Sequence, residues 1–212
     1  MNASKKQAYK TAAQTIIQNL KPRNIEGFYC NDCKEAIEKV RELLPDGCSV
    51  GWGGSATFEE SGVKDMLLSG NYHIIDRDKA TTPEEKKEVF LQIAGADYFF
   101  MSTNAITING ELINIDGSGN RLAPFMYGPD HVIILAGMNK VVSDIESGIQ
   151  RIRQSACPPN AVRLHTNTPC EIYGTCKDCH ASGCICSQIV ITRHSRQSGR
   201  ISVILIGEDL GF

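Results

Sequence analysis

The sequence has no long hydrophobic run. Its longest uninterrupted apolar stretch, Val132–Met138 (VIILAGM), is far shorter than the roughly 20 residues that cross a bilayer. The first twenty residues have neither the apolar centre nor the cleavage site of a secretory signal. We therefore expect a cytoplasmic protein with no membrane partner.

The chain also lacks an excess of either charge. It has 22 Lys and Arg against 24 Asp and Glu, a formal net charge of -2. Nucleic-acid binding requires a basic face or stripe, and the one basic segment, residues 193–200, is short and has no aromatic residue. No nucleic-acid partner is expected. With 212 residues and 42% apolar content, we expect a single domain over residues 1–212, with a helical arm at 1–20 and a cysteine-rich loop at 168–187.

Several catalytic motifs are missing. There is no Gly-x-Ser-x-Gly elbow, no His-Glu-x-x-His zinc motif and no phosphate-binding Gly-Lys-Ser/Thr. The five histidines are scattered along the chain. The residues alone therefore predict a ligand pocket without indicating a reaction.

Strand and helix patterns alternate along the chain. Helices are expected at 1–20, 31–47, 57–70, 83–95 and 143–156, and strands at 25–30, 48–52, 72–76, 96–102, 131–137, 188–194 and 200–207. Residues 105–115 form a hairpin pattern around Asn109-Gly110. The order predicts an α/β fold of three layers, a Rossmann-like and mainly parallel sheet with an inserted β-hairpin.

A glycine-rich loop follows the strand at 48–52, at the carboxyl edge of the sheet, where open α/β sheets bind ligands. We expect the loop to bind an anion through Gly53, Gly54, Ser55 and Thr57. Two alternatives stay open: a turn that merely needs glycine, and a dinucleotide site built on Gly51-x-Gly53-x-x-Ala56 with Asp76. Glu59 and Glu60 disfavour the dinucleotide, because they place negative charge near a diphosphate.

A second polar group surrounds the hairpin and the end of the next strand. Its members are Ser102, Thr103, Asn104, Asp116, Gly119, Asn120, Arg121 and Lys140. Arg121 suits a carboxylate or phosphate, because its guanidinium donates two parallel hydrogen bonds. We expect Arg121→Ala to abolish anion binding with little loss of stability. The alternative is that Asp116 and Asn120 only satisfy the backbone of turns.

Six segments together resemble the LUD-domain family, the lactate-utilisation proteins, in its short stand-alone bacterial type. They are GWGGSATFEESG, STNAITINGELINIDGSGNR, GPDHVIILAGMNKVV, RIRQSACPPNAVRL, TPCEIYGTCKDC and GRISVILIGEDLGF. The resemblance implies the fold of ribose-5-phosphate isomerases, sugar-phosphate deaminases and CoA transferases (NagB/RpiA/CoA-transferase-like), with the ligand on the Gly53-Gly54-Ser55 loop. It also implies a homodimer. The catalytic glutamate of those enzymes has no evident counterpart in its motif context.

Five of the nine cysteines lie between residues 170 and 186. In a reducing compartment, disulfides are the least favoured interpretation. Cys170, Cys176, Cys179 and Cys186 match the family's own C-x5-C-x2-C-x6-C pattern, which implies a four-thiolate site for zinc or an iron–sulfur cluster. Cys184 stands outside this pattern. The alternative is a set of reduced thiols packed as small apolar residues.

Three functions follow from the resemblance and the residues together. The first is binding of a small anionic metabolite, as a component of L-lactate oxidation to pyruvate. The second is a stand-alone enzyme acting on a sugar phosphate, CoA thioester or folate-like substrate. The third is a non-catalytic partner of the iron–sulfur lactate-oxidation proteins that are encoded beside some family members.

Overall fold

Six parallel strands form the central sheet of the computed structural model, which describes residues 1–212. Their order across the sheet is β1 (Ile25–Cys30), β10 (Ile201–Ile206), β7 (His131–Gly137), β4 (Tyr98–Met101), β2 (Ser49–Trp52) and β3 (His73–Ile75). Every residue of β10, and all of β7 except His131, is buried. Unbroken apolar burial is typical of central strands in parallel sheets, whose two faces are both covered.

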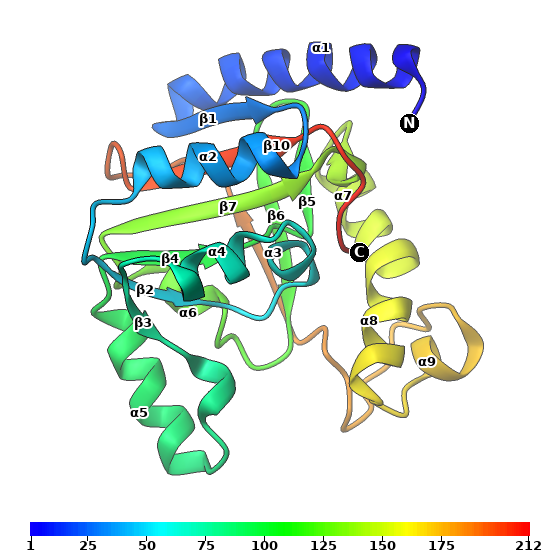
Figure 1. Ribbon diagram of the computed structural model, residues 1–212. Helices are drawn as coiled ribbons and strands as arrows, with labels where there is room; N and C mark the ends of the chain where they lie inside the picture. The colour runs from blue at the N-terminus through cyan, green and yellow to red at the C-terminus, as the bar shows by residue number, and fades with distance from the viewer.

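Helices cover both faces of this sheet and complete three layers (Figure 1). One core contains residues of α1 (Ala3–Leu20), α5 (Pro83–Ala94) and α6 (Leu122–Met126). The other contains residues of α2 (Cys33–Leu43), α3 (Ala56–Glu60) and α4 (Val63–Ser69). The predicted three-layer α/β fold is confirmed, and none of the helices has the length and apolar character to cross a membrane.

A second sheet of four strands stands beside the first. Its order is β8 (Val141–Val142), β5 (Ala105–Thr107), β6 (Leu112–Asp116) and β9 (Gln188–Thr192). The antiparallel β5–β6 pair is the predicted hairpin, and Gly110 in its turn has the positive φ of +91° that favours glycine. The hairpin is half of this sheet. Strand β8 pairs with β5 on one side, and β9 pairs antiparallel with the whole length of β6 on the other.

Helices α7 (Ile145–Arg151), α8 (Cys157–Leu164) and α9 (Pro169–Tyr173) lie at the end of the molecule near the C-terminus (Figure 1). A π-helical turn, residues 152–156, joins α7 to α8. The helix predicted to end at Ala156 thus continues for eight more residues. Pro158 lies in the first turn of α8, where a missing backbone N–H costs little.

The segment predicted as one helix at 57–70 is two helices. Gly62 separates α3 from α4 with a left-handed φ of +74°, which a glycine adopts at little cost. The sequence Thr57-x-x-Glu60 has the form of a capping box, which would make Thr57 the N-cap of this helix, but that prediction is wrong. Ser55 caps α3, because its hydroxyl accepts the Phe58 N–H, while the buried Thr57 hydroxyl donates to the carbonyl of Leu210.

Candidate ligand-binding site

A cavity of about 470 Å³ opens at the carboxyl edge of the central sheet. Its lining includes residues within three positions of the ends of four strands: Ser55 after β2, Arg77 after β3, Ser102 after β4 and Lys140 after β7. The opposite wall comes from the end of β6 and from α8. The cavity therefore lies where the two sheets meet, at the edge where α/β folds bind ligands, and its volume is in the usual range of ligand sites.

All the residues predicted to bind the anionic ligand line this cavity except Gly53 and Gly119. Those that do are Gly54, Ser55, Thr57, Ser102, Thr103, Asn104, Asp116, Asn120, Arg121 and Lys140. The glycine loop and the polar hairpin base, separate in the sequence, thus face one space. Whether each of these residues contacts a ligand stays a prediction.

Gly53 and Gly119 have supporting positions. A Cβ at Gly53 would lie 2.6 Å from Cγ of Arg121, so the absence of a side chain lets Arg121 pass over the loop. Gly119 has a φ of +80°, and its N–H donates to Oδ1 of Asp116 at 2.9 Å. Both glycines therefore shape the wall that holds Arg121.

Arg121 is a largely buried charge of the cavity wall, with a side chain that is 12% exposed. Its Nε donates to Oδ2 of Asp116 at 3.3 Å, and its Nη2 donates to Oδ1 of Asn104 and to the carbonyl of Ile115, both at 2.9 Å. Burial lowers the pKa of Arg121, and Asp116 opposes that shift. The guanidinium stays charged at any physiological pH. Because its Nη1 has no acceptor in the protein, two N–H donors remain for a ligand.

Basic side chains dominate the charge of the lining. Among its side chains are four basic groups, those of Arg77, Arg121, Lys140 and Arg163, and a single carboxylate, Asp116, which Arg121 already pairs. The Nζ of Lys140 donates to the main-chain oxygen of Phe212 at 2.7 Å, so the three guanidinium groups are the cations that remain for a ligand. Arg77 is 3.9 Å from its nearest carboxylate, on Asp78, and the guanidinium of Arg163 bonds only to the amide oxygen of Asn160. This charge balance favours an anionic ligand.

The hydroxyl groups of the site differ in whether their hydrogen is already used in a hydrogen bond within the protein. Ser102 and Thr103 donate to backbone carbonyls, and Thr57 donates to Leu210. Ser55 only accepts, from the Phe58 N–H, so its O–H hydrogen is free. The side chain of Asn120 makes no hydrogen bond within the protein. Ser55 and Asn120 are thus the neutral side chains best placed to bind a ligand.

Family comparison agrees with the motifs. The model of the LUD domain matches residues 13–206. The chain belongs to the LUD domain family. A structure similar to this LUD domain is that of a DUF162 family protein from Deinococcus radiodurans, with 11% sequence identity, a TM-score of 0.48, and 95% of this chain and 98% of that chain covered. No curated protein matches the sequence.

Part of the site in this LUD domain had not been predicted. Arg77, Asn160, Arg163, Leu164, Cys157, Cys184, Ile185 and Phe212 also line the cavity. Arg77 directly follows a predicted strand, so the carboxyl-edge rule was a usable signal for it. The sequence held no such signal for the α8 residues, because the predicted helix ends at Ala156.

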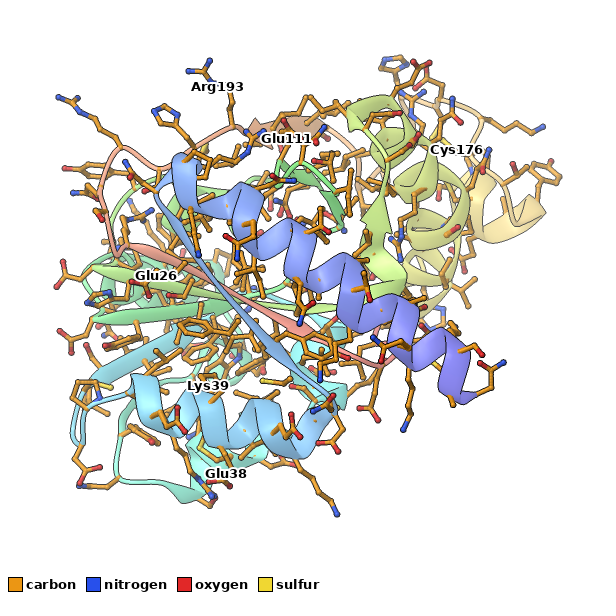
Figure 2. The ribbon with its side chains drawn as sticks, turned by 90° about the horizontal axis from the view of Figure 1, so that it is seen from above. Glu26, Glu38, Lys39, Glu111, Cys176 and Arg193 are labelled. Carbon is orange, nitrogen blue, oxygen red and sulfur yellow. The ribbon has the colours of Figure 1, made fainter.

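The cysteine segment of the LUD domain lies against this cavity. All nine cysteines are free thiols, and Sγ of Cys157 on α8 lies 3.3 Å from Sγ of Cys186. Burial raises the pKa of Cys170, and nearby Cys176, Cys186 and Cys179 raise it further. Figure 2 shows Cys176 at the α8–α9 end of the molecule, across the view from Glu38 and Lys39 of α2.

The structure thus gathers the four predicted metal ligands, together with Cys157 and Cys184. The sulfur atoms fit thiolate chemistry, which zinc and iron–sulfur clusters prefer. No three His, Cys, Asp or Glu side chains are nevertheless arranged as a ready-made metal site. The four-cysteine site therefore stays a prediction, for which metal content is the test.

Proposed function

We propose that this LUD domain binds a small anionic metabolite in the cavity at the carboxyl edge of its central sheet. The observation that carries the proposal is the convergence of the guanidinium groups of Arg77, Arg121 and Arg163 on one space whose single side-chain carboxylate, Asp116, is already paired. A buried or half-buried guanidinium binds carboxylate and phosphate groups with geometric selectivity.

The contacts suggest a division of roles. Arg121 is held rigidly by Asp116 and Asn104, so Nη1 presents its donors in a fixed direction. Arg77 and Arg163 lie on separate elements and have weak partners within the protein. We assign Arg121 to anchor the anionic group, and Ser55 and Asn120 to orient the remainder.

The family's association with lactate utilisation supports a component of L-lactate oxidation to pyruvate as the first candidate function. Both compounds are carboxylates and match the charge of the cavity. A second candidate is an enzyme for a sugar phosphate, CoA thioester or folate-like substrate. The size of the cavity favours this second candidate, because a volume of about 470 Å³ accommodates a ligand much larger than a three-carbon acid.

A thermal-shift screen tests the proposal with L-lactate, pyruvate, ribose 5-phosphate, CoA, NAD and inorganic phosphate. A ligand at about 100 times its dissociation constant stabilises the folded state by about 2.7 kcal/mol. At the same ligand concentration the stabilisation should fall to about 1.4 kcal/mol in Arg163→Ala, for a dissociation constant raised about tenfold, and should be unchanged in Arg41→Ala. Arg41 is a suitable control because it lies on α2 and pairs only with Glu38. If no compound shifts the melting temperature, the proposal fails.

A further inference from the structure

Cys157 and Cys186 bring two thiols into contact from segments that are 29 residues apart in the sequence. Their Sγ atoms lie 3.3 Å apart, within hydrogen-bonding distance. An approach of roughly 1.3 Å would bring them to the S–S length of a disulfide, which is about 2.05 Å. No third His, Cys, Asp or Glu side chain completes a metal site around the pair. The two sulfur atoms are therefore already placed to react with each other.

Other contacts hold both cysteines in position. Cys157 begins α8, directly after the π-helical turn, and is only 5% exposed. Cys186 lies in the loop before β9 and packs against the small apolar core that contains Cys157. Directly after Cys186, the N–H of Ser187 donates to the carbonyl of Asp116 at 2.9 Å. Each thiol therefore belongs to a segment that the rest of the fold anchors.

The two thiols differ in their relation to the candidate ligand cavity. Cys157 lines the cavity, whereas Cys186 does not. A small reagent that enters the cavity therefore meets the Cys157 sulfur, which is in contact with a second thiol. An accessible thiol beside a thiol that can resolve its oxidised form is the arrangement of redox-responsive cysteines.

We propose that Cys157 and Cys186 are a site of reversible oxidation, at which a peroxide converts the two thiols into a disulfide. The Cys157 sulfur attacks one oxygen of hydrogen peroxide, the O–O bond breaks, and the other oxygen leaves as water with the thiol proton. The Cys186 sulfur then displaces the oxygen of the Cys157 sulfenic acid, so that an S–S bond replaces the S–O bond and a second water leaves. The pair loses two electrons to the peroxide, and a dithiol returns them by exchange.

The disulfide would act on both candidate sites of the protein. It joins α8, which forms one wall of the cavity, to the loop before β9. It also withdraws the Cys186 sulfur from the four cysteines predicted to bind metal, so the two uses of Cys186 exclude each other. A disulfide that forms only on oxidation is compatible with nine free thiols in a reducing environment.

Peptide mapping of the wild-type protein tests the disulfide. The reduced protein is treated with one equivalent of hydrogen peroxide, the remaining thiols are alkylated, and the peptides are analysed by mass spectrometry. We expect a peptide pair that links Cys157 to Cys186 and that is lost after dithiothreitol. The reaction is run on the protein as purified and after treatment with a chelator, so that a bound metal cannot conceal Cys186. If neither sample contains this link, or if another pair such as Cys176 and Cys179 accounts for the disulfide in both, the proposal is overturned.

Dimedone, which traps sulfenic acids, tests the order of the two steps. In Cys186→Ser the oxidised Cys157 has lost its partner thiol, so the label should accumulate on Cys157. Cys157→Ser should leave Cys186 unlabelled, whereas label on Cys186 in this variant and none on Cys157 in the other would overturn the route through the cavity.

Cys33→Ser is the matched control and should still form the link between Cys157 and Cys186. Cys33 is more exposed than Cys157, but its thiol donates to a carboxylate oxygen of Glu208 at 2.8 Å and has no second thiol beside it. Loss of the link in Cys33→Ser would count against the assigned pair. Neither experiment uses an anionic ligand, so failure of the proposed anion site and failure of this inference are separate results.

Discussion

Arg121 and Asp116 form a 3.3 Å ion pair in the cavity wall, with side chains only 12% and 10% exposed. The same carboxylate accepts the N–H of Gly119, so Asp116 holds both the turn after β6 and the guanidinium that follows it. A site built in this way couples ligand binding to the local stability of the hairpin. The expectation that Arg121 is dispensable for stability does not fit these contacts.

Arg121→Ala should therefore weaken both the fold and the site. The substitution leaves Asp116 as a buried carboxylate without its partner and removes a donor from Asn104. Removing one partner of a buried ion pair typically lowers the free energy of unfolding by about 3–5 kcal/mol. The loss here should not exceed this range, because both side chains keep some exposure. Urea unfolding measures the change in the free energy of unfolding. An unchanged unfolding midpoint would show that the pair is not structural.

Arg163→Ala should weaken anion binding and leave stability unchanged. Arg163 is exposed on α8, and its guanidinium bonds only to Asn160 one turn earlier. Surface changes of this kind usually alter the free energy of unfolding by less than about 0.5 kcal/mol. Loss of a charged hydrogen bond to the ligand should raise the dissociation constant by about tenfold. Calorimetric titration with the best ligand of the screen measures it, and an unaltered value would remove Arg163 from the site.

Gly53→Ala and Gly54→Ala form a matched pair in one loop. A Cβ at Gly53 would meet Cγ of Arg121 at 2.6 Å and Phe99 at 3.2 Å, whereas at Gly54 the nearest atom is Nη1 of Arg77 at 3.7 Å. We expect Gly53→Ala to displace Arg121 and reduce anion affinity by at least about tenfold, a cost of ~1.4 kcal/mol. Gly54→Ala should bind nearly as well as the wild type. Equal affinities for the two variants would contradict the proposed position of Arg121.

The metal prediction is tested on anaerobically purified protein. If Cys170, Cys176, Cys179 and Cys186 bind metal, elemental analysis should find close to one equivalent of zinc, or the iron of one cluster, per chain. Structural zinc binds tightly enough to survive purification, so less than about a tenth of an equivalent of either metal would exclude the site. Cys186→Ser should lose the metal and Cys48→Ser should retain it, because Cys48 is buried in a core on the far side of the central sheet from α1.

The sequence alone determined the order of elements and the edge of the sheet that carries the site. Apolar periodicity, helix caps and the Asn109-Gly110 turn are local signals, and each depends on residues close together in the chain. The carboxyl-edge rule then placed Ser55, Asn104, Arg121 and Lys140 in one region before their contacts were known. The break at Gly62 was missed because a single glycine within a helical pattern does not by itself end a helix.

Only the tertiary structure decided how the site is enclosed and what its residues have left to offer a ligand. The pairing of β9 with β6 joins residues more than seventy positions apart and leaves no local pattern in the sequence. Three further contacts leave no local pattern either: α8 forms the second wall, Cys157 lies beside Cys186, and the main-chain oxygen of Phe212 accepts a hydrogen bond from Lys140. Burial and hydrogen-bond saturation depend on all the groups that surround a side chain, and packing brings these groups together from distant parts of the chain.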